Sequence, residues 1–524
     1  MSAWDYIIVG AGSAGCVLAD RLSTDPGNRV LLLEAGPVDR HPLIHIPRGA
    51  PLIYGNPRYA WFFRTEAHDD IPAETWIRGK MLGGSSAING MMYFRGQPED
   101  YDHWERLGAT GWGWNAMGAA FRAIEKHEGH GGPLGVTTST EQTPLTEAFI
   151  AAGEALGLPR KVDLNSPGQE GIGYAPRTIS GGRRQTAAST FLARAAKRPN
   201  LTIRTGALVD RVLFDGTQAA GVAVRVDGRA EEIRCPGETI LACGGLISPQ
   251  VLQRSGVGDA ALLGSLGIPV VAHSPGVGEH LLEHRLLRMD YDVDAWSQNR
   301  DLRSWRLALS ALDYALRRKG PLASAYAPVG AFARVLAESA TPDVEILMAV
   351  LVPEVRTDGK MKPEAGHSLR VFGYPLRSRS EGFVRIASAD PDVPARIRAN
   401  FLDDPYDRRV TVAMHRFIRR LMEQPPLKAL GVCERDYTSN IETDEEIIAA
   451  YRMQGGAGYH ACGTCRMGDY PDAVLDAKLR VRGTSQLRVV DGSIMPTMVS
   501  ANTNGPIMAS AWRASDLILE GRNR

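Results

Sequence analysis

The sequence has 524 residues, enough for about two to four domains, and its 44% hydrophobic and 23% charged residues are typical of folded globular proteins. The formal net charge is +1, with no acidic or basic block, so composition does not indicate nucleic-acid binding. No apolar run approaches the roughly 18 residues of a membrane helix. Six cysteines are too few for a disulfide framework in a chain of this length. We therefore expect a cytoplasmic protein without a membrane span, and without a signal peptide because the first glycine motif begins at residue 10.

The N-terminal 36 residues carry the clearest local pattern. An apolar run at 6–9 precedes Gly10, Gly12 and Gly15, and a helical stretch then leads to a second apolar run that ends at Glu34. This order predicts a βαβ unit in which Gly10 forms a tight turn, Gly12 lets the backbone approach a pyrophosphate, and Gly15 allows close helix–strand packing. The helix N-terminus would face the phosphates, and Glu34 would accept hydrogen bonds from a ribose. The unit predicts a dinucleotide site, for FAD or NAD.

The next segments are irregular. Residues 37–75 are rich in proline, and we expect a long irregular excursion of the kind that often carries function. Residues 78–90 are mainly glycine and small polar residues, which would let the backbone lie directly against a flat or phosphorylated ligand. An ordinary glycine-rich loop is the alternative interpretation. Helical, tryptophan-containing sequence follows between residues 99 and 130.

Strand patterns return at residue 201. Apolar runs at 201–205, 207–214, 221–226 and 238–243 predict strands, and the last leads through two glycines into a helix. A strand that ends in glycines and feeds a helix is typical of a nucleotide-binding βα element. The fold that starts at the N-terminus is therefore expected to resume here.

Residues 290–450 have a different pattern and predict a second domain inserted into the first. The expected elements are an amphipathic helix, three strand regions and a further helix, at 301–318, 345–354, 368–376, 382–388 and 406–422. A last helix should run from Pro506 to about Leu519, because proline fits a first helical turn. We predict an α/β fold with a Rossmann-like domain and a discontinuous substrate domain of antiparallel sheet plus helices. The expected boundaries are 1–150, 200–290 and 451–524 for the first, and 151–199 and 291–450 for the second.

Longer motifs follow one another along the chain. They are Gly10-x-Gly12-x-x-Gly15 with Glu34-Ala35-Gly36, Gly79-Lys80-Met81-Leu82-Gly83-Gly84-Ser85-Ser86-x-x-Asn89, Gly244-Gly245-x-x-Ser248-Pro249, Pro275-Gly276-Val277-Gly278, His460-x-x-Gly463-Thr464-Cys465-Arg466-Met467-Gly468, and Val490-Asp491-Gly492-Ser493 with Asn502-Thr503-Asn504. Together they resemble the glucose–methanol–choline (GMC) oxidoreductases, flavoenzymes that oxidise alcohols, over nearly the whole chain. The usual Asn-Leu-x-Asp-His of that family is replaced by His280-Leu281-Leu282-Glu283-His284, so we assign these positions no role.

The resemblance selects FAD over NAD and implies the FAD-binding fold of the GMC family. It implies that Glu34 holds the adenosine ribose, that Val209 lies at the adenine, and that Asp491 lies near the ribityl–phosphate region. Some relatives attach the flavin through a histidine where this chain has Ile88, so we expect non-covalent FAD. The expected FAD-binding residues are Gly10, Gly12, Ser13, Ala14, Gly15, Glu34, Ala35, Met81, Gly83, Gly84, Ser85, Asn89, Gly90, Met91, Val209, Asp491, Gly492, Asn502 and Asn504.

Oxidising an alcohol on a flavin moves a hydride to N5 and removes the hydroxyl proton, which calls for a base that works near neutral pH. His460 matches the catalytic histidine of the family, and a structural loop histidine is the alternative. The second catalytic position of the family is assigned to Asn504, which could hydrogen-bond the substrate oxygen or simply cap the following helix. The N-terminus of that helix would face the N1–C2=O edge of the flavin. No metal is expected.

Two other classes of function stay open. Cys462 and Cys465 have the C-x-x-C spacing of flavin dithiol reductases. A flavin-binding protein without catalysis is the third possibility, against which the pairing of His460 with Asn504 argues.

The substrate pocket should be lined from 54–63, 91–95 and 291–450, and by Tyr459. Aromatic and methionine residues in these segments suit a small aromatic or heteroaromatic primary alcohol of the pyridoxine or hydroxymethylfurfural type, with O2 as electron acceptor. These residues are Trp61, Phe62, Met91, Met92 and Tyr93, and plain core packing is the alternative for them. A choline-type or aliphatic alcohol dehydrogenase with another electron acceptor stays open.

Overall fold

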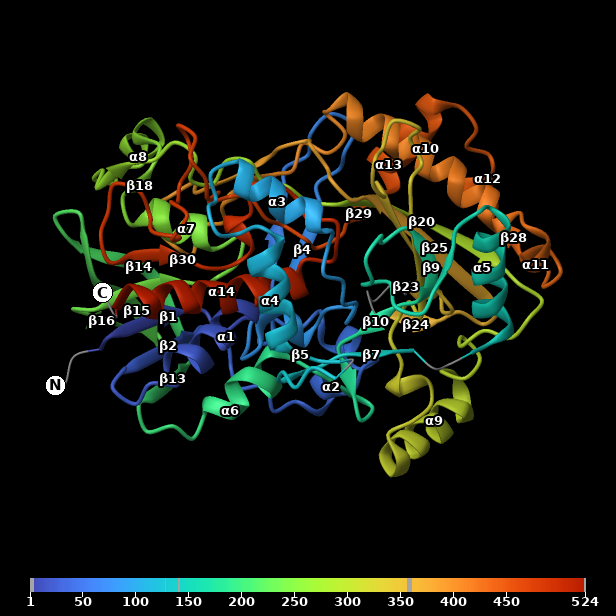
Figure 1. The fold of residues 1–524 in the computed structure, drawn as a ribbon, viewed down its shortest axis with the longest axis horizontal. Coiled ribbons are helices and arrows are strands. Elements are labelled where there is room, and N and C mark those ends of the chain that lie inside the picture. The colour runs from blue at the N-terminus through green and yellow to red at the C-terminus, as the bar shows by residue number, and fades with distance from the viewer. Residues whose placement is uncertain (1–3, 128, 140–141, 356–360, 523–524) are drawn as a thin grey trace.

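The computed structural model describes residues 4–127, 129–139, 142–355 and 361–522, and each half of the molecule is built on a sheet (Figure 1). The sheet of the first half is parallel throughout. Its strands in spatial order are β13 (Leu201–Thr205), β2 (Val30–Glu34), β1 (Tyr6–Val9), β17 (Glu238–Leu241) and β30 (Leu487–Val489). The predicted dinucleotide-binding fold and its resumption near residue 238 are confirmed.

Two helices from opposite ends of the chain pack together beside this parallel sheet. Helix α1 (Ser13–Leu22) packs against β1 and β2, and α14 (Asn504–Arg522) lies along α1 (Figure 1). An ion pair of 2.6 Å between Arg21 and Asp516 joins the two helices. Every residue of β1 and β2 is buried, which explains their uninterrupted apolar sequence. The two ends of the chain therefore meet at the dinucleotide motif.

The excursion at 37–75 is more ordered than the sequence indicated. It contains α2 (Pro42–His45) and the strand β3 (Ala60–Arg64), which pairs antiparallel with β4 (Thr75–Gly79). The prediction of an irregular segment is wrong for β3. The apolar run of this strand, 60–63, is only four residues long between proline-rich flanks, and its aromatic residues alternate between partly buried and exposed, so its surroundings favoured a loop.

The second half is built on an eight-stranded, mostly antiparallel sheet. Seven of its strands, in spatial order, are β28 (Cys433–Glu434), β20 (Arg285–Asp292), β25 (Ser368–Pro375), β22 (Val344–Ala349), β21 (Val329–Ala333), β9 (Gly171–Tyr174) and β8 (Arg160–Lys161). The eighth, β29 (Gly456–Ala457), pairs with β20. The predicted strand at 368–376 and the first part of that at 345–354 belong to this sheet, whereas β26 (Phe383–Arg385) pairs with β27 (Arg396–Arg398) in a separate two-stranded sheet.

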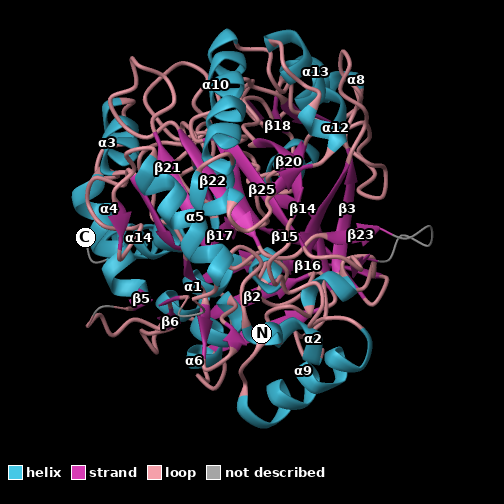
Figure 2. Ribbon diagram, turned by 90° about the vertical axis from the view of Figure 1, so that its right-hand side faces the viewer, coloured by secondary structure: helices cyan, strands magenta, loops and turns pink. Residues whose placement is uncertain are grey.

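The two faces of this sheet have different surroundings. Helices α10 (Pro405–Met422) and α5 (Pro144–Ala155) cover one face, as Figure 2 shows. On the opposite face, Leu347 and Tyr374 belong to the core that contains the parallel sheet. The second sheet therefore turns this face toward the dinucleotide-binding half.

We propose a domain division that follows these sheets and is close to the expected one. Strands β8 and β9 join the second sheet from the 151–199 segment, as proposed. Strand β20 begins at Arg285, so we propose that the second domain starts there rather than at residue 291. None of the helices in the described ranges combines the length and apolar character that crossing a bilayer requires.

Two predicted helices are confirmed with small shifts. The predicted amphipathic helix at 301–318 is α9 (Ser304–Arg317), which projects at the lower edge of Figures 1 and 2. Helix α14 begins at Asn504, two residues before the predicted start, and Pro506 lies in its first turn.

Candidate active site

A cavity of about 440 Å³ lies between the two sheets and joins both halves of the molecule. Its lining includes most of the residues predicted to bind the dinucleotide. These are Gly10, Gly12, Ser13, Ala14, Glu34, Ala35, Gly84, Ser85, Asn89, Gly90, Met91, Val209, Asp491, Gly492, Asn502 and Asn504. Gly15, Met81 and Gly83 lie outside the lining. His460 lines the same cavity, so the predicted base and the dinucleotide motif share one space.

The three glycines of the first motif have distinct geometries. Gly10 has φ +96°, and a Cβ there would lie 2.7 Å from the Ala242 carbonyl oxygen. A Cβ on Gly15 would lie 1.8 Å from the Gly10 carbonyl oxygen, which only close helix–strand packing explains. A Cβ on Gly12 would meet no atom within 4 Å, and Gly12 lines the cavity. This geometry suits the tight turn and the close packing predicted for Gly10 and Gly15, and the approach of a pyrophosphate to Gly12 stays a prediction.

Other lining positions also leave room for a large ligand. Gly90 and Gly244 line the cavity, and a Cβ on either would meet no protein atom within 4 Å. The backbone of the turn at Gly84 packs against Gly12. A Cβ added to Gly84 would lie 2.7 Å from the Gly12 Cα. A row of glycine backbone with free space in front of it is the cradle that a pyrophosphate and a flat ring need.

Two buried carboxylates shape the dinucleotide end of the cavity. Glu34 accepts hydrogen bonds from the backbone N–H groups of Ala11 (2.9 Å) and Gly36 (2.8 Å). Burial raises the pKa of Glu34 to about 7, an effect that these two hydrogen bonds partly offset. Asp491 accepts from Ser248 Oγ at 2.5 Å and from the Gly244 N–H at 2.8 Å, and so fixes the glycine turn. Both carboxylates line the cavity, and their contacts with the ribose and the ribityl–phosphate region stay predictions.

The catalytic end contains two histidines in contact. Nδ1 of His460 lies 2.8 Å from Nδ1 of His284, and both side chains are buried. Nε2 of His284 lies 3.1 Å from the Leu376 carbonyl oxygen, which can only accept a hydrogen bond. Nε2 of His284 therefore carries its proton. Burial lowers the pKa of His284 to about 4, so the neutral ring has a bare Nδ1.

This hydrogen-bond chain fixes the tautomer of His460. Because Nδ1 of His284 accepts, Nδ1 of His460 must donate. Burial first, and then the neighbouring His284 and Arg78, lower the pKa of His460 well below its usual value. The ring is therefore neutral, and its Nε2 carries a lone pair that accepts a hydrogen bond from Asn502 Nδ2. Asn502 Nδ2 lies 3.1 Å from that nitrogen.

A buried carboxylate holds the backbone of both histidines. Oε1 of Glu283 accepts from the His460 N–H at 2.6 Å and from the His284 N–H at 2.9 Å. Arg78 lies 3.4 Å from its other oxygen. Burial raises the pKa of Glu283 to about 7, and Arg78 opposes the shift. Sequence reasoning gave no role to Glu283 or His284; Glu283 departs from the family pattern, whereas His284 keeps its histidine.

Asn502, rather than Asn504, is the asparagine beside His460. Asn502 Nδ2 also donates to Tyr374 Oη at 2.9 Å, and its Oδ1 is buried without a partner in the described part of the chain. Asn504 instead accepts a hydrogen bond from Ser13 Oγ at 2.7 Å, at the dinucleotide motif. The geometry therefore does not support Asn504 as the partner of His460, and it gives that position to Asn502.

The wall opposite the dinucleotide motif is aromatic in part. Of the residues predicted for the pocket, Trp61, Met91 and Met92 line the cavity. Phe62 is 44% exposed, and Tyr93 is buried with its hydroxyl on Glu125, so neither belongs to the lining. Alternation along β3 turns Phe62 outward. The second sheet adds lining residues that the sequence did not single out, which are Leu286, Arg288, Leu347, Arg370, Phe372 and Tyr374.

The cysteine pair is placed unfavourably for redox chemistry. Cys462 and Cys465 are buried free thiols, and neither lines the cavity. Burial raises the pKa of both thiols above the ordinary value, so the reactive thiolate is disfavoured. Sγ of Cys462 faces the Met498 sulfur at 3.6 Å.

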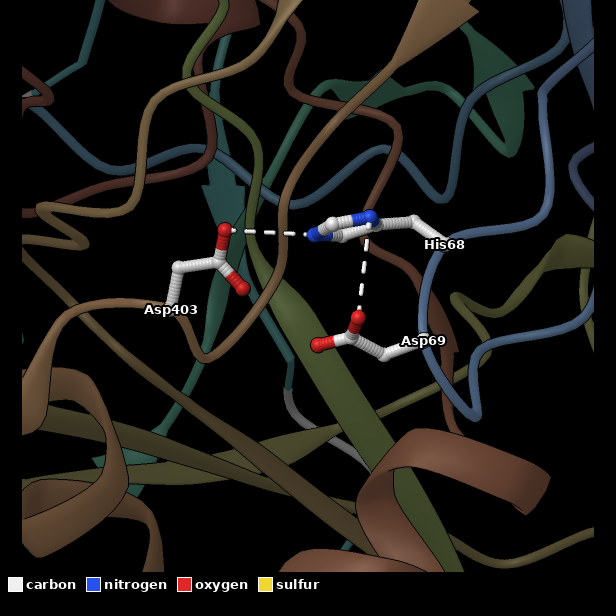
Figure 3. Close-up of side chains that lie close together, drawn as sticks. All are labelled: His68, Asp69 and Asp403. Atoms are coloured by element: carbon white, nitrogen blue, oxygen red, sulfur yellow. Dashed lines mark hydrogen bonds and ion pairs between the residues drawn. The ribbon is translucent and has the colours of Figure 1, made fainter.

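One cluster outside the cavity has side chains of the types that bind metal ions. Nε2 of His68 lies 3.3 Å from Asp403, and Nδ1 lies 3.9 Å from Asp69. Figure 3 shows the His68 ring facing both carboxylates. Arg452 lies 4.0 Å from Asp69 as well. Ion pairing accounts for this arrangement, and we assign it no catalytic role.

Comparison with known proteins agrees with this geometry. Residues 4–286 match the N-terminal part, and residues 378–511 the C-terminal part, of the family described as GMC oxidoreductase. The chain is 36% identical over 530 residues to an alcohol dehydrogenase [acceptor] of Pseudomonas putida, covering 98% of this chain and 96% of that protein. It is 37% identical over 537 residues to mitochondrial choline dehydrogenase of Homo sapiens, with 98% and 89% covered. The structure of pyridoxine 4-oxidase from Mesorbium loti matches with a TM-score of 0.88, 31% identity and 99% of each chain covered.

Proposed function

The chain belongs to the GMC oxidoreductase family, whose members oxidise alcohols with FAD, and from this premise we propose that it converts a small aromatic or heteroaromatic primary alcohol to the aldehyde. The observation that carries the proposal is the position of His460, which lines the same cavity as the dinucleotide motif. FAD, when bound, supplies the hydride acceptor at N5. The open glycines Gly12, Gly90 and Gly244 fit such a ligand, and Ile88 offers no attachment point for a covalent flavin.

The residues of this chain would handle the proton and the alkoxide. As the hydride leaves the carbinol carbon, the hydroxyl proton passes to Nε2 of His460, whose lowered pKa keeps it unprotonated at neutral pH. Asn502 would hold the substrate oxygen, because its Nδ2–H beside His460 Nε2 can donate a hydrogen bond to the alkoxide that forms. The oxidation balances, because each alcohol that becomes an aldehyde loses one hydride and one proton. Asn504 would bind FAD beside Ser13.

We also propose O2 as electron acceptor, supported by the likeness to pyridoxine 4-oxidase. The alternative is a dehydrogenase that uses another acceptor, supported by the likeness to the Pseudomonas putida enzyme, and choline is the alternative substrate, supported by the human relative. A dithiol reductase is the least supported function, because Cys462 and Cys465 are buried away from the cavity. The cytoplasmic location expected from sequence stays a prediction.

The test is a panel of alcohols with the purified FAD-loaded protein. Benzyl alcohol, furfuryl alcohol, pyridoxine, choline and a long aliphatic alcohol are each mixed with the enzyme without oxygen, and flavin bleaching is followed. The aromatic alcohols should reduce the flavin fastest. His460→Ala should retain FAD and slow reduction by about 100-fold or more, as expected for loss of a general base. Reoxidation under air with peroxide release would support the oxidase. Reduction by choline or the aliphatic alcohol alone would refute the aromatic substrate.

A further inference from the structure

Three arginines line the substrate part of the cavity, and they differ in their partners. Arg78 lies 3.4 Å from Glu283. Arg370 forms a two-pronged ion pair with Asp290, at 2.6 and 2.8 Å. The guanidinium of Arg288 has no hydrogen bond or ion pair with any residue of the described ranges. It is a cavity-facing cation that the protein itself leaves without a counter-charge.

The position of Arg288 is set by sheet pairing. On the cavity-facing side, Arg288 lies directly opposite Phe372 of the neighbouring strand. Phe372 is two residues from Tyr374, whose ring centroid lies 5.5 Å from that of His460. Two residues of a strand span roughly 7 Å. Arg288 is thus one short step along the sheet from the reacting end, a length that a single aromatic ring bridges.

The chain leaves space for this guanidinium. β29 pairs with β20 beside Arg288, and Gly456 of β29 would place a Cβ 3.0 Å from its Nη1. Any larger residue there would crowd the guanidinium. Phe372 lies next to it across the sheet, and Leu347 lies next to Phe372 on the following strand, so the cation is bordered by apolar surface on that side.

No carboxylate of the described residues lines the substrate part of the cavity. The two acidic lining residues are Glu34 and Asp491, which belong to the dinucleotide end and are satisfied by backbone and serine donors. A quaternary ammonium would find no counter-charge beside Arg288. An anion would find a planar, permanently charged donor there.

We infer that the alcohol substrate carries a carboxylate on the far side of its ring, that Arg288 binds this carboxylate, and that the carbinol is held at His460 and Asn502. The inference rests on the proposed function and names its substrate class: hydroxymethyl arenes or furans with a carboxylate opposite the hydroxymethyl group. A substrate of this class would distinguish this protein from enzymes that act on choline.

The test compares 4-(hydroxymethyl)benzoate with benzyl alcohol. In the wild-type enzyme the carboxylate should have the higher kcat/KM for flavin reduction. Arg288→Gln should lower the ratio of the two kcat/KM values by roughly 10- to 100-fold, mainly through KM, because one charged hydrogen-bonding partner is lost. Arg288→Lys should recover part of the ratio. Arg317→Gln on the exposed face of α9 is the matched control and should leave the ratio unchanged.

A binding measurement on the wild type guards against a variant that does not fold. Benzoate should perturb the flavin spectrum with a dissociation constant about tenfold or more below that of benzamide, for the same reason. Equal use of both alcohols, or equal binding of benzoate and benzamide, would overturn the role of Arg288 while leaving alcohol oxidation intact. Failure of every alcohol to reduce the flavin would overturn the proposed function itself.

A second, independent observation concerns the projecting helix α9. Trp305, Leu309, Leu312 and Leu316 recur at intervals of four, three and four residues, so they lie on one face, and each is 54% or more exposed. The opposite face is packed through Ser310 and Tyr314. An exposed row of large apolar side chains of this kind marks an interaction surface.

The charge around this apolar row selects the partner. Residues 300–319 contain six basic and two acidic side chains, a net charge of +4, and Arg300, Arg317, Arg318 and Lys319 are exposed. A tryptophan- and leucine-lined helix with basic flanks is suited to lie in the headgroup region of an anionic lipid surface. We propose that α9 docks the protein on such a membrane surface without crossing it.

Vesicle flotation tests this docking. The FAD-loaded protein should float with phosphatidylglycerol-containing vesicles, much less with phosphatidylcholine alone, and less at high salt. Leu312→Asp/Leu316→Asp should abolish flotation, whereas Val162→Asp, at a 91% exposed apolar residue elsewhere, should not. Equal flotation of the double variant would refute the proposal. A dimer that the double variant disrupts, with no flotation of the wild type, would show that a second copy covers the helix instead.

Discussion

Nδ1 of His284 lies 2.8 Å from Nδ1 of His460, and the carbonyl oxygen beyond His284 fixes the direction of that hydrogen bond. The lone pair of His460 is consequently left on Nε2, the nitrogen beside Asn502. A base is therefore prepared before substrate arrives, through a residue that itself needs to touch neither substrate nor flavin.

Replacing His284, whose Nδ1 accepts this hydrogen bond, should disturb the tautomer of His460. His284→Leu leaves Nδ1–H of His460 without a partner, so the ring is free to carry its proton on Nε2, where it cannot act as a base. Flavin reduction should slow by roughly 10- to 100-fold. Stopped-flow reduction across pH measures this, with FAD content as the folding control. His284→Asn, which keeps a side-chain acceptor, should lose less. An unchanged rate in His284→Leu would remove the positioning role.

Replacing the two nearby asparagines should separate two effects. Asn502→Ala removes the amide beside His460 and should slow flavin reduction by roughly 100- to 1000-fold, as loss of an alkoxide-stabilising donor does. Asn504→Ala removes the partner of Ser13 and should weaken FAD binding more than reduction. Reduction rate and FAD dissociation constant, measured on both variants, decide the assignment. The reverse pattern would return the catalytic position to Asn504.

Local sequence predicted the dinucleotide end of this site better than the substrate end. Gly10, Gly12 and Gly15 act within one strand–turn–helix unit, so their spacing alone carries their roles. Asn502 and Asn504 are two residues apart at a helix start, and only the fold decides which faces His460. Arg288 reaches the cavity through pairing of β20 with β25, some 80 residues later, and no local pattern records that pairing.

Filling the glycine cradle should expel the cofactor. Gly12→Val would project two methyl groups into the space that faces the cavity, where no protein atom lies within 4 Å of a Cβ. We expect FAD content to fall at least about tenfold while the apoprotein stays folded, because the substitution creates no clash within the protein. Flavin absorbance of the purified protein and its circular dichroism measure the two quantities. Gly264→Val, also open but on the short helix α8 (Ala260–Ser265), is the control.

The buried thiols should be dispensable for turnover. Cys462→Ala/Cys465→Ala removes both sulfurs without placing a new polar group in the core, and we expect alcohol-dependent flavin reduction within about threefold of the wild type, with a loss of stability of roughly 1–2 kcal/mol. Anaerobic reduction and thermal unfolding measure the two effects. Collapse of turnover with FAD still bound would instead support dithiol chemistry.

Glu345 gives the protein a pH dependence of its own. Its carboxyl is fully buried opposite Tyr374, and burial raises its pKa to about 8. The folded state therefore holds this proton between the ordinary carboxyl pKa and pH 8, and the unfolded state does not. The associated stability is fully present below pH 4.5 and is lost as pH rises toward 8.

Glu345→Gln keeps the shape and removes the titration. The difference in unfolding free energy between variant and wild type should shift in favour of the variant by up to about 1.4 kcal/mol per pH unit across this window. Urea unfolding of both FAD-loaded proteins at matched pH values measures the difference, in which groups common to both cancel. A difference that stays constant with pH would mean that the carboxyl of Glu345 is already ionised in the folded protein.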